Sequence, residues 1–194
     1  MSSRVPTADA ADNKLSDDVI GNKSDAAAKV VGTAKSIVAY LKGLLSFQIP
    51  IEATGTADID ISAGDYTGFL TLLTITPAAG SSLADVVIDL DWNKATTGFD
   101  TVATAADTLD VVCVSKVDGT NWRTIATGTQ VTANGDGSLE DHESGQRFKL
   151  GMIGVNGAVK VMVKISAEHD DVEIPYRVMY RGPAAPTITP VAAG

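Results

Sequence analysis

The spacing of apolar side chains changes once along the chain, from a helical period before residue 48 to an alternating period after it. In the segment 25–47 apolar residues recur at intervals of three and four, which places them on one side of an α-helix. Ser24 is a good N-cap and Pro50 prevents continuation, so we expect one amphipathic helix at 25–47. The apolar residues on that side, called here the helix seam, are Val30, Ala34, Ile37, Val38, Leu41, Leu44 and Leu45.

The helix seam requires a partner. A helix of this length is only marginally stable by itself in water, because most helical stability in proteins comes from packing of the apolar side. The seam must therefore pack on the rest of the chain or on copies of itself in other subunits. We predict that its residues make contacts with other protein chains.

From residue 49 onward apolar and polar side chains alternate, as in strands with one buried face. In the segment 56–61, for example, every second residue is apolar and the residues between them include Asp58 and Asp60. Turn sequences rich in Gly, Pro and Asn separate such segments. Eight short strands predict a mainly β fold, an antiparallel β-sandwich or jelly roll preceded by an arm and one α-helix. The expected strands are 56–61, 69–76, 84–92, 108–117, 122–127, 147–155, 159–166 and 172–180.

Local signals add three expectations for the β region. The pair Asn156-Gly157 is typical of a tight turn and predicts a hairpin that joins 149–155 to 159–165. Pro175 cannot donate a ladder hydrogen bond, which moves the strand 172–180 toward a sheet edge. The proline-rich segment 183–194 is expected to be an extended tail that does not pair in a sheet.

The first 24 residues are polar and poor in large apolar side chains, so they predict a flexible arm that becomes ordered only against a partner. The expected organisation is therefore an arm at 1–24, the helix at 25–47, a β body at 48–182 and the tail at 183–194.

The charge is uneven along the chain. The net charge is −9, but residues 1–48 carry six basic and five acidic side chains, whereas residues 49–194 carry nine basic and nineteen acidic ones. An acidic body repels phosphate backbones, which argues against direct binding of nucleic acid. No apolar run reaches the roughly 18 residues that a membrane-spanning helix needs, and no signal-peptide core is visible near residue 1, so we expect no membrane partner and assembly in the cytoplasm.

Metal-binding patterns are incomplete. Asp89, Asp91 and Asn93 match the first three ligand positions of an EF-hand loop and Asp100 matches the twelfth, but Lys94 stands where the tight turn needs Gly. Alternating Asp on the solvent face of a strand explains the pattern more simply. A second acidic segment lacks a fixed ligand spacing and is interpreted as a solvated loop, so no metal or other cofactor is expected. Its polar residues are Asn134, Asp136, Glu140, Asp141 and Glu143.

Candidate catalytic groups are equally unspecific. His142 and His169 are the two histidines, and no nucleophile elbow, phosphate-binding loop or His-Glu-x-x-His motif is present, so we expect no enzyme. Cys113 is the single cysteine, which excludes an internal disulfide, and its apolar neighbours predict a buried strand thiol. Aromatic side chains could stack on a sugar ring, although core and edge packing is their commoner role. These aromatic residues are Tyr66, Trp92, Trp122, Tyr176 and Tyr180.

One part of the chain resembles a known class. The segment 18–27, Asp-Val-Ile-Gly-Asn-Lys-Ser-Asp-Ala-Ala, and the segment 33–44, Thr-Ala-Lys-Ser-Ile-Val-Ala-Tyr-Leu-Lys-Gly-Leu, resemble a recurrent N-terminal segment of structural proteins encoded by tailed bacteriophages. In such proteins the segment precedes a β-rich body. The resemblance implies a virion part, either a capsid decoration (cement) protein or a fibre-like appendage.

The resemblance and the residues together favour a decoration protein that binds the outer capsid surface, bridges capsomers and stabilises the virion. Its expected partners are the major capsid protein and itself, as a homotrimer located on the virion after assembly in the host cytoplasm, with the helix seam making the oligomer or capsid contacts. The alternative is a head or tail fibre, a receptor-binding protein whose β body binds host surface glycans. A carbohydrate-active enzyme is a third class, but it needs a distinct carboxylate pair.

Overall fold

The structure is a computed structural model that describes residues 41, 42, 44, 45, 50–61, 68–93, 97–116, 120–134, 145–155 and 157–191. The predicted arm at 1–24 lies outside the described residues. The same holds for Val30, Ala34, Ile37 and Val38 of the helix seam.

The described residues of the β region form ten strands and one short helix, α3, at Phe99–Val102. The expectation of a mainly β, antiparallel fold is confirmed. All eight predicted strands are present, with ends shifted by a few residues, while β6 and β10 were not expected. The strands are β1 Ile51–Ile61, β2 Leu70–Thr76, β3 Leu83–Asp91, β4 Thr108–Lys116, β5 Trp122–Thr127, β6 Val131–Thr132, β7 Gly145–Ile153, β8 Val159–Ile165, β9 His169–Arg181 and β10 Thr187–Pro190.

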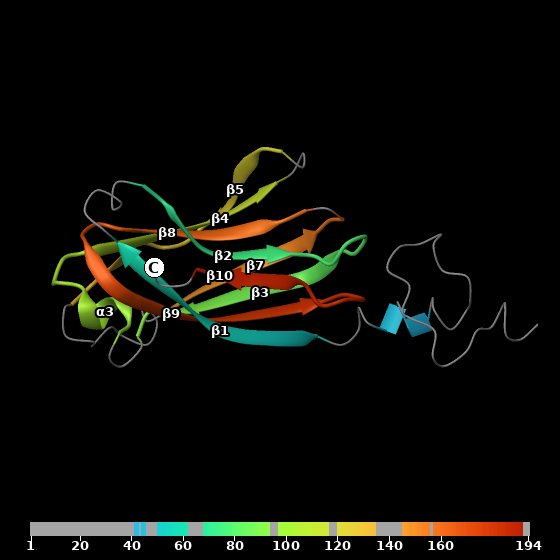
Figure 1. Ribbon diagram of the computed structural model, residues 1–194, viewed down its shortest axis with the longest axis horizontal. Helices are drawn as coiled ribbons and strands as arrows, with labels where there is room; N and C mark the ends of the chain where they lie inside the picture. Colours follow the sequence, from blue (N-terminus) through green and yellow to red (C-terminus); the bar gives the residue numbers. More distant parts are fainter. Residues whose placement is uncertain are drawn as a thin grey trace, which may run out of the picture.

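Two antiparallel sheets face each other (Figure 1). One sheet has the order β1-β9-β3-β7, and the other has the order β10-β2-β8-β4-β5, with β6 also paired to β4. The first strand of the body pairs with a late one and each following strand pairs with an earlier-ending one, as in the pairs β1·β9, β2·β8, β3·β7 and β4·β5. The body is therefore one long hairpin that has been rolled up, which also brings β3 beside β9 and β4 beside β8. This is the strand arrangement of a jelly roll.

Alternation along the strands builds the core between the sheets. In β8 the side chains of Val159, Val161, Val163 and Ile165 are buried, and the lysines and methionine between them are partly exposed. Ile88 and other apolar side chains of the facing sheet belong to the same buried cluster. Each fully buried aliphatic side chain of this kind contributes about 1.5–3 kcal/mol, so the apolar period that predicts the strands is also what holds the sheets together.

The hairpin predicted from Asn156-Gly157 is wrong. The chain does reverse there, because the Gly157 N–H donates to the Gly154 carbonyl at 2.9 Å. However, β7 pairs with β3 in one sheet and β8 pairs with β2 and β4 in the other, so the link crosses between the sheets. A turn sequence specifies a local reversal but not the pairing of the flanking strands. Here burial of both apolar faces against each other decides the pairing.

The expectation that Pro175 marks an edge strand is also wrong. Its strand, β9, lies between β1 and β3. Pairing with β3 ends at Leu90 and Tyr176, so Pro175 lies where β9 has a paired neighbour on one side, at Thr56 of β1. A proline is tolerated at such a place because the second ladder has already ended.

The proline-rich tail was predicted to stay outside the sheets, and for residues 187–190 this is wrong. β10 pairs antiparallel with β2, and Ile188 packs against the core. The Val191 N–H continues this contact by donating to the Leu72 carbonyl at 2.8 Å. β10 is an edge strand and Pro190 is its last residue, which are positions where the missing N–H of proline costs little.

Candidate functional site

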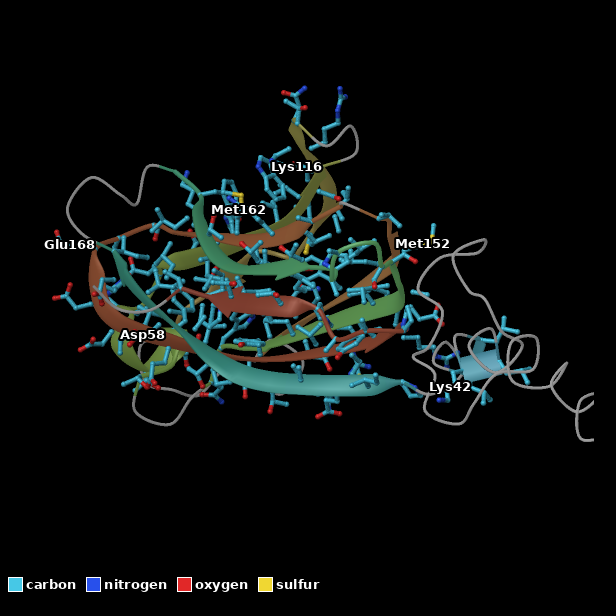
Figure 2. All side chains as sticks on the ribbon, turned by 45° about the vertical axis from the view of Figure 1, so that its right-hand side comes forward. Lys42, Asp58, Lys116, Met152, Met162 and Glu168 are labelled. Atoms are coloured by element: carbon cyan, nitrogen blue, oxygen red, sulfur yellow. The ribbon has the colours of Figure 1, made fainter. Side chains whose placement is uncertain are left out.

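The described end of the helix seam is exposed to solvent. Leu41, Leu44 and Leu45 are helical and lie three and four residues apart, with exposed fractions of 52%, 64% and 59%. Figure 2 shows Lys42 of the same segment beyond the end of the strands. Three leucines on one side of a helical segment form an apolar surface that the chain's own β body does not cover, which is the arrangement expected of a contact to another chain.

Asp89 is the first residue of the EF-hand-like spacing, and its carboxylate binds two arginine side chains. It stands on β3 opposite Arg147 of β7 and Arg177 of β9. Arg147 donates from Nε at 2.5 Å and Nη2 at 2.9 Å, and Arg177 donates from Nη2 at 2.6 Å. The hydrogen bonds from Arg147 contribute most to holding the pKa of Asp89 below its usual range, and those from Arg177 add to this against the opposing effect of burial. Asp89 therefore ties three strands together.

The other residues of that spacing have separate roles. Asp91 accepts a hydrogen bond from the Asn93 N–H at 2.9 Å, as in a turn that follows a strand. Asp100 is fully buried in α3 and accepts from the Asn134 N–H at 2.6 Å. Each of these carboxylates is therefore engaged in a local structural contact. Asp136, Glu140, Asp141 and Glu143 lie outside the described residues, as does His142.

His169 meets a carboxylate at the end of the sandwich. Its Nε2 lies 2.9 Å from Oδ2 of Asp107, and that oxygen also accepts from the Thr104 hydroxyl at 2.6 Å. Burial pushes the pKa of Asp107 upward, but the hydrogen bonds from Thr104 and His169 outweigh it and the pKa lies below its usual value. The Ser166 hydroxyl contacts Asp107 at 3.4 Å. A nucleophilic triad would instead need the hydroxyl on the imidazole, so this cluster links β4, β8 and β9 without that geometry.

The aromatic residues do not form one platform. Trp92, Tyr176 and Tyr180 are buried in the core, which confirms the packing interpretation for these three. Tyr66 lies outside the described residues. Trp122 on β5 is the exception, since it is 36% exposed. Cys113 is buried on β4 as expected, and burial raises the pKa of its thiol to about 12.

A carboxylate cluster that the sequence pattern did not reveal lies between β1 and β9. Oxygens of Asp58, Asp60 and Asp171 all lie within 4.8 Å of one another, and the Asp171 N–H donates to Oδ1 of Asp60 at 3.1 Å. The spacing of the first two residues was visible, but Asp171 joins them only through the β1·β9 pairing near its bulge. Asp58 and Asp60 are partly buried and Asp171 is exposed. Because acidic side chains often cluster on acidic proteins without an ion, we assign no metal to the cluster.

A hollow of about 550 Å³ lies beside β6 and β7. The described residues of its wall carry hydroxyl, amide and apolar groups but no ionisable side chain, so they provide no general acid or base. They are Thr129, Gln130, Val131, Thr132, Asn134, Gly145 and Gln146.

Comparisons of the sequence and the fold with known proteins found a weak structural similarity. No family model matches the sequence, and no curated protein matches it. A similar solved chain comes from the crystal structure of the infectious bursal disease virus VP2 subviral particle, with 15% sequence identity and a TM-score of 0.34. The match covers 75% of this chain and 38% of that chain, so this chain spans well under half of that relative's length. At this level the similarity does not bear on function. Among the described residues no helix is long and apolar enough to cross a membrane.

Proposed function

We propose that this chain is a capsid decoration (cement) protein of a tailed bacteriophage, which binds the outer capsid surface as a homotrimer and bridges capsomers. The observation that carries the proposal is the exposure of Leu41, Leu44 and Leu45 in a helical segment directly before the β body. The resemblance of residues 18–27 and 33–44 to phage structural proteins supports the choice of a virion as the place where these leucines are covered.

Energetics favours a structural contact. Removing a leucine side chain from water contributes about 1.5–3 kcal/mol, so three exposed leucines provide a substantial driving force for association. Several weak attachment points on one oligomer combine into strong binding when they engage at the same time. Attached copies then stabilise the assembled shell by mass action, because they bind intact capsomers and not dissociated ones.

The decisive experiment compares particles with and without the protein. We expect particles that lack it to release DNA at a lower temperature and after milder osmotic shock, while adsorption to host cells stays nearly normal. If genome release is unchanged and adsorption fails, the chain is a fibre or receptor-binding protein. Hydrolysis of host glycan by the isolated protein would instead indicate a virion enzyme.

A variant of the seam tests the same proposal at the level of contacts. We expect Leu41→Asp combined with Leu44→Asp to reduce the oligomer mass in sedimentation and to abolish attachment to particles, because buried unpaired charges are costly. Circular dichroism should still show a folded β body. The matched control is Met152→Asp, which removes an apolar side chain of β7 that is 72% exposed. Equal behaviour of the two variants would contradict a specific role for the seam.

A further inference from the structure

The described arginines of the sheet β1-β9-β3-β7 have carboxylate partners. Arg147 and Arg177 bind Asp89, and Arg181 lies 3.4 Å from Asp85. This is expected, because acidic side chains outnumber basic ones by nineteen to nine in residues 49–194.

Lys116 and Lys160 are arranged differently. Their ammonium groups lie 5.2 Å and 4.7 Å from the centroid of the Trp122 indole ring. Neither forms a salt bridge with another of the residues that the structure describes. The register explains the cluster, since Lys116 of β4 is opposite Trp122 of β5, and Lys160 of β8 is opposite the nearby Val114 of β4. Two ammonium groups beside one ring repel each other, and a carboxylate between them would relieve that repulsion.

The cluster lies beside a free strand edge. In the described part of the chain β5 pairs only with β4, and the hairpin of these two strands projects from the sandwich (Figure 1). Figure 2 shows Lys116 on this projecting side of the body. Trp122 and Ile125 of β5 are 36% and 44% exposed, and an edge strand offers a row of backbone N–H and C=O groups to another strand.

We propose that the edge of β5 binds an extended acidic polypeptide segment of a partner protein, which adds a strand to the sheet and places carboxylates against Lys116 and Lys160. Backbone hydrogen bonds to β5 would supply affinity, as in other cases of strand addition. Side chains of the added strand alternate between faces, so its acidic residues should stand at every second position. The site is separate from the helix seam, and the proposal holds whether or not the chain decorates a capsid.

Charge complementarity favours this ligand over nucleic acid. Lysines and an exposed tryptophan are also features of surfaces that bind single-stranded nucleic acid. However, a long phosphate backbone would have to pass over a body with ten more acidic than basic groups, whereas a short acidic strand occupies only the basic edge.

The test uses the full chain and a fluorescent peptide of alternating valine and glutamate, with binding followed by anisotropy. We expect binding that weakens as NaCl is added. The double variant Lys116→Gln, Lys160→Gln should bind about tenfold more weakly, as expected for the loss of two exposed ion pairs. Lys149→Gln, which removes an exposed lysine of β7, is the matched control and should bind as the parent does.

Modified ligands separate strand addition from simple charge attraction. Only alternate amides of an added strand point toward β5. Of two peptides N-methylated on the odd or the even residues, one should therefore lose binding and the other should keep it. Equal binding of both, or tighter binding of polygalacturonate or oligothymidylate than of the peptide, would overturn the proposal. Absence of peptide binding would also overturn it, and the lysines would then serve only to keep the edge from aggregating.

Discussion

Asp89 shows how much of this fold can depend on a single side chain, because its carboxylate joins β3 to both of its neighbours. We expect Asp89→Asn to lower the free energy of unfolding at pH 7 by about 1–2 kcal/mol, since charge-assisted hydrogen bonds are lost and Arg147 is partly exposed. Urea denaturation measures this difference. Asp85→Asn is the control, because that side chain is 67% exposed and its ion pair is longer.

The same carboxylate gives a signed pH dependence. The folded-state pKa of Asp89 is lowered from an unfolded value near 3.8, so its stabilising effect is present above that pH and is lost as the pH falls through the folded pKa. The stability difference between the parent protein and Asp89→Asn should therefore shrink in acid. If the stability difference stays constant as the pH is lowered from 7 until the protein unfolds, the arginines do not favour the ionised form of Asp89.

Cys113 provides a second prediction at this scale. Burial raises the pKa of its thiol from 9.0 to about 12, which lowers the thiolate fraction at pH 8 on the order of a thousandfold. We expect a thiol reagent to label the native protein very slowly and the urea-unfolded protein quickly. Fast labelling of the native protein would mean that β4 opens readily at this position.

At the scale of elements, the unexpected strand β10 should matter for stability. Deleting residues 187–194 removes Ile188 from the core and uncovers the edge of β2. We expect a loss of about 2 kcal/mol or more in the free energy of unfolding, together with a greater tendency to aggregate. Deleting only residues 192–194 keeps β10 and is the control. If the two truncations unfold at the same urea concentration, the pairing of β10 with β2 contributes nothing.

Strand positions could be predicted from the sequence, whereas strand partners could not. Alternation of apolar residues located β8 within one residue, because one-sided burial acts on each strand separately. β5 also lies at the predicted 122–127, although nearly all of its residues are exposed. The pairing of β7 with β3 depends on residues far apart in sequence, and the turn at Gly157 contains no information about it. For the same reason the sequence did not predict the Asp89 network or the cluster of Lys116 and Lys160 at Trp122. Each of these depends on the register of three strands.

At the scale of the whole molecule, attachment should depend on parts outside the β body. Residues 1–24 contain too few apolar side chains to fold upon themselves, so we expect them to act through contacts with other chains. Removing them should abolish binding to particles while the thermal unfolding of the body stays unchanged. Cosedimentation with particles measures this, and Lys149→Gln in the full chain serves as the control. Full occupancy by the truncated protein would show that the arm is dispensable.

The rolled hairpin also sets an order of events during synthesis. The ribosome makes β1 before any other strand of the body, but it makes the partner strand β9 after β2 to β8. The pairing of Ile51 with Tyr180 can therefore form only after nearly the whole body has been synthesised. Pairings this distant in sequence are slow to form. The nascent chain therefore leaves the ribosome with the helix seam already outside and the sandwich still open. If the seam joins subunits as proposed, their association can begin before the strands of the body have all paired.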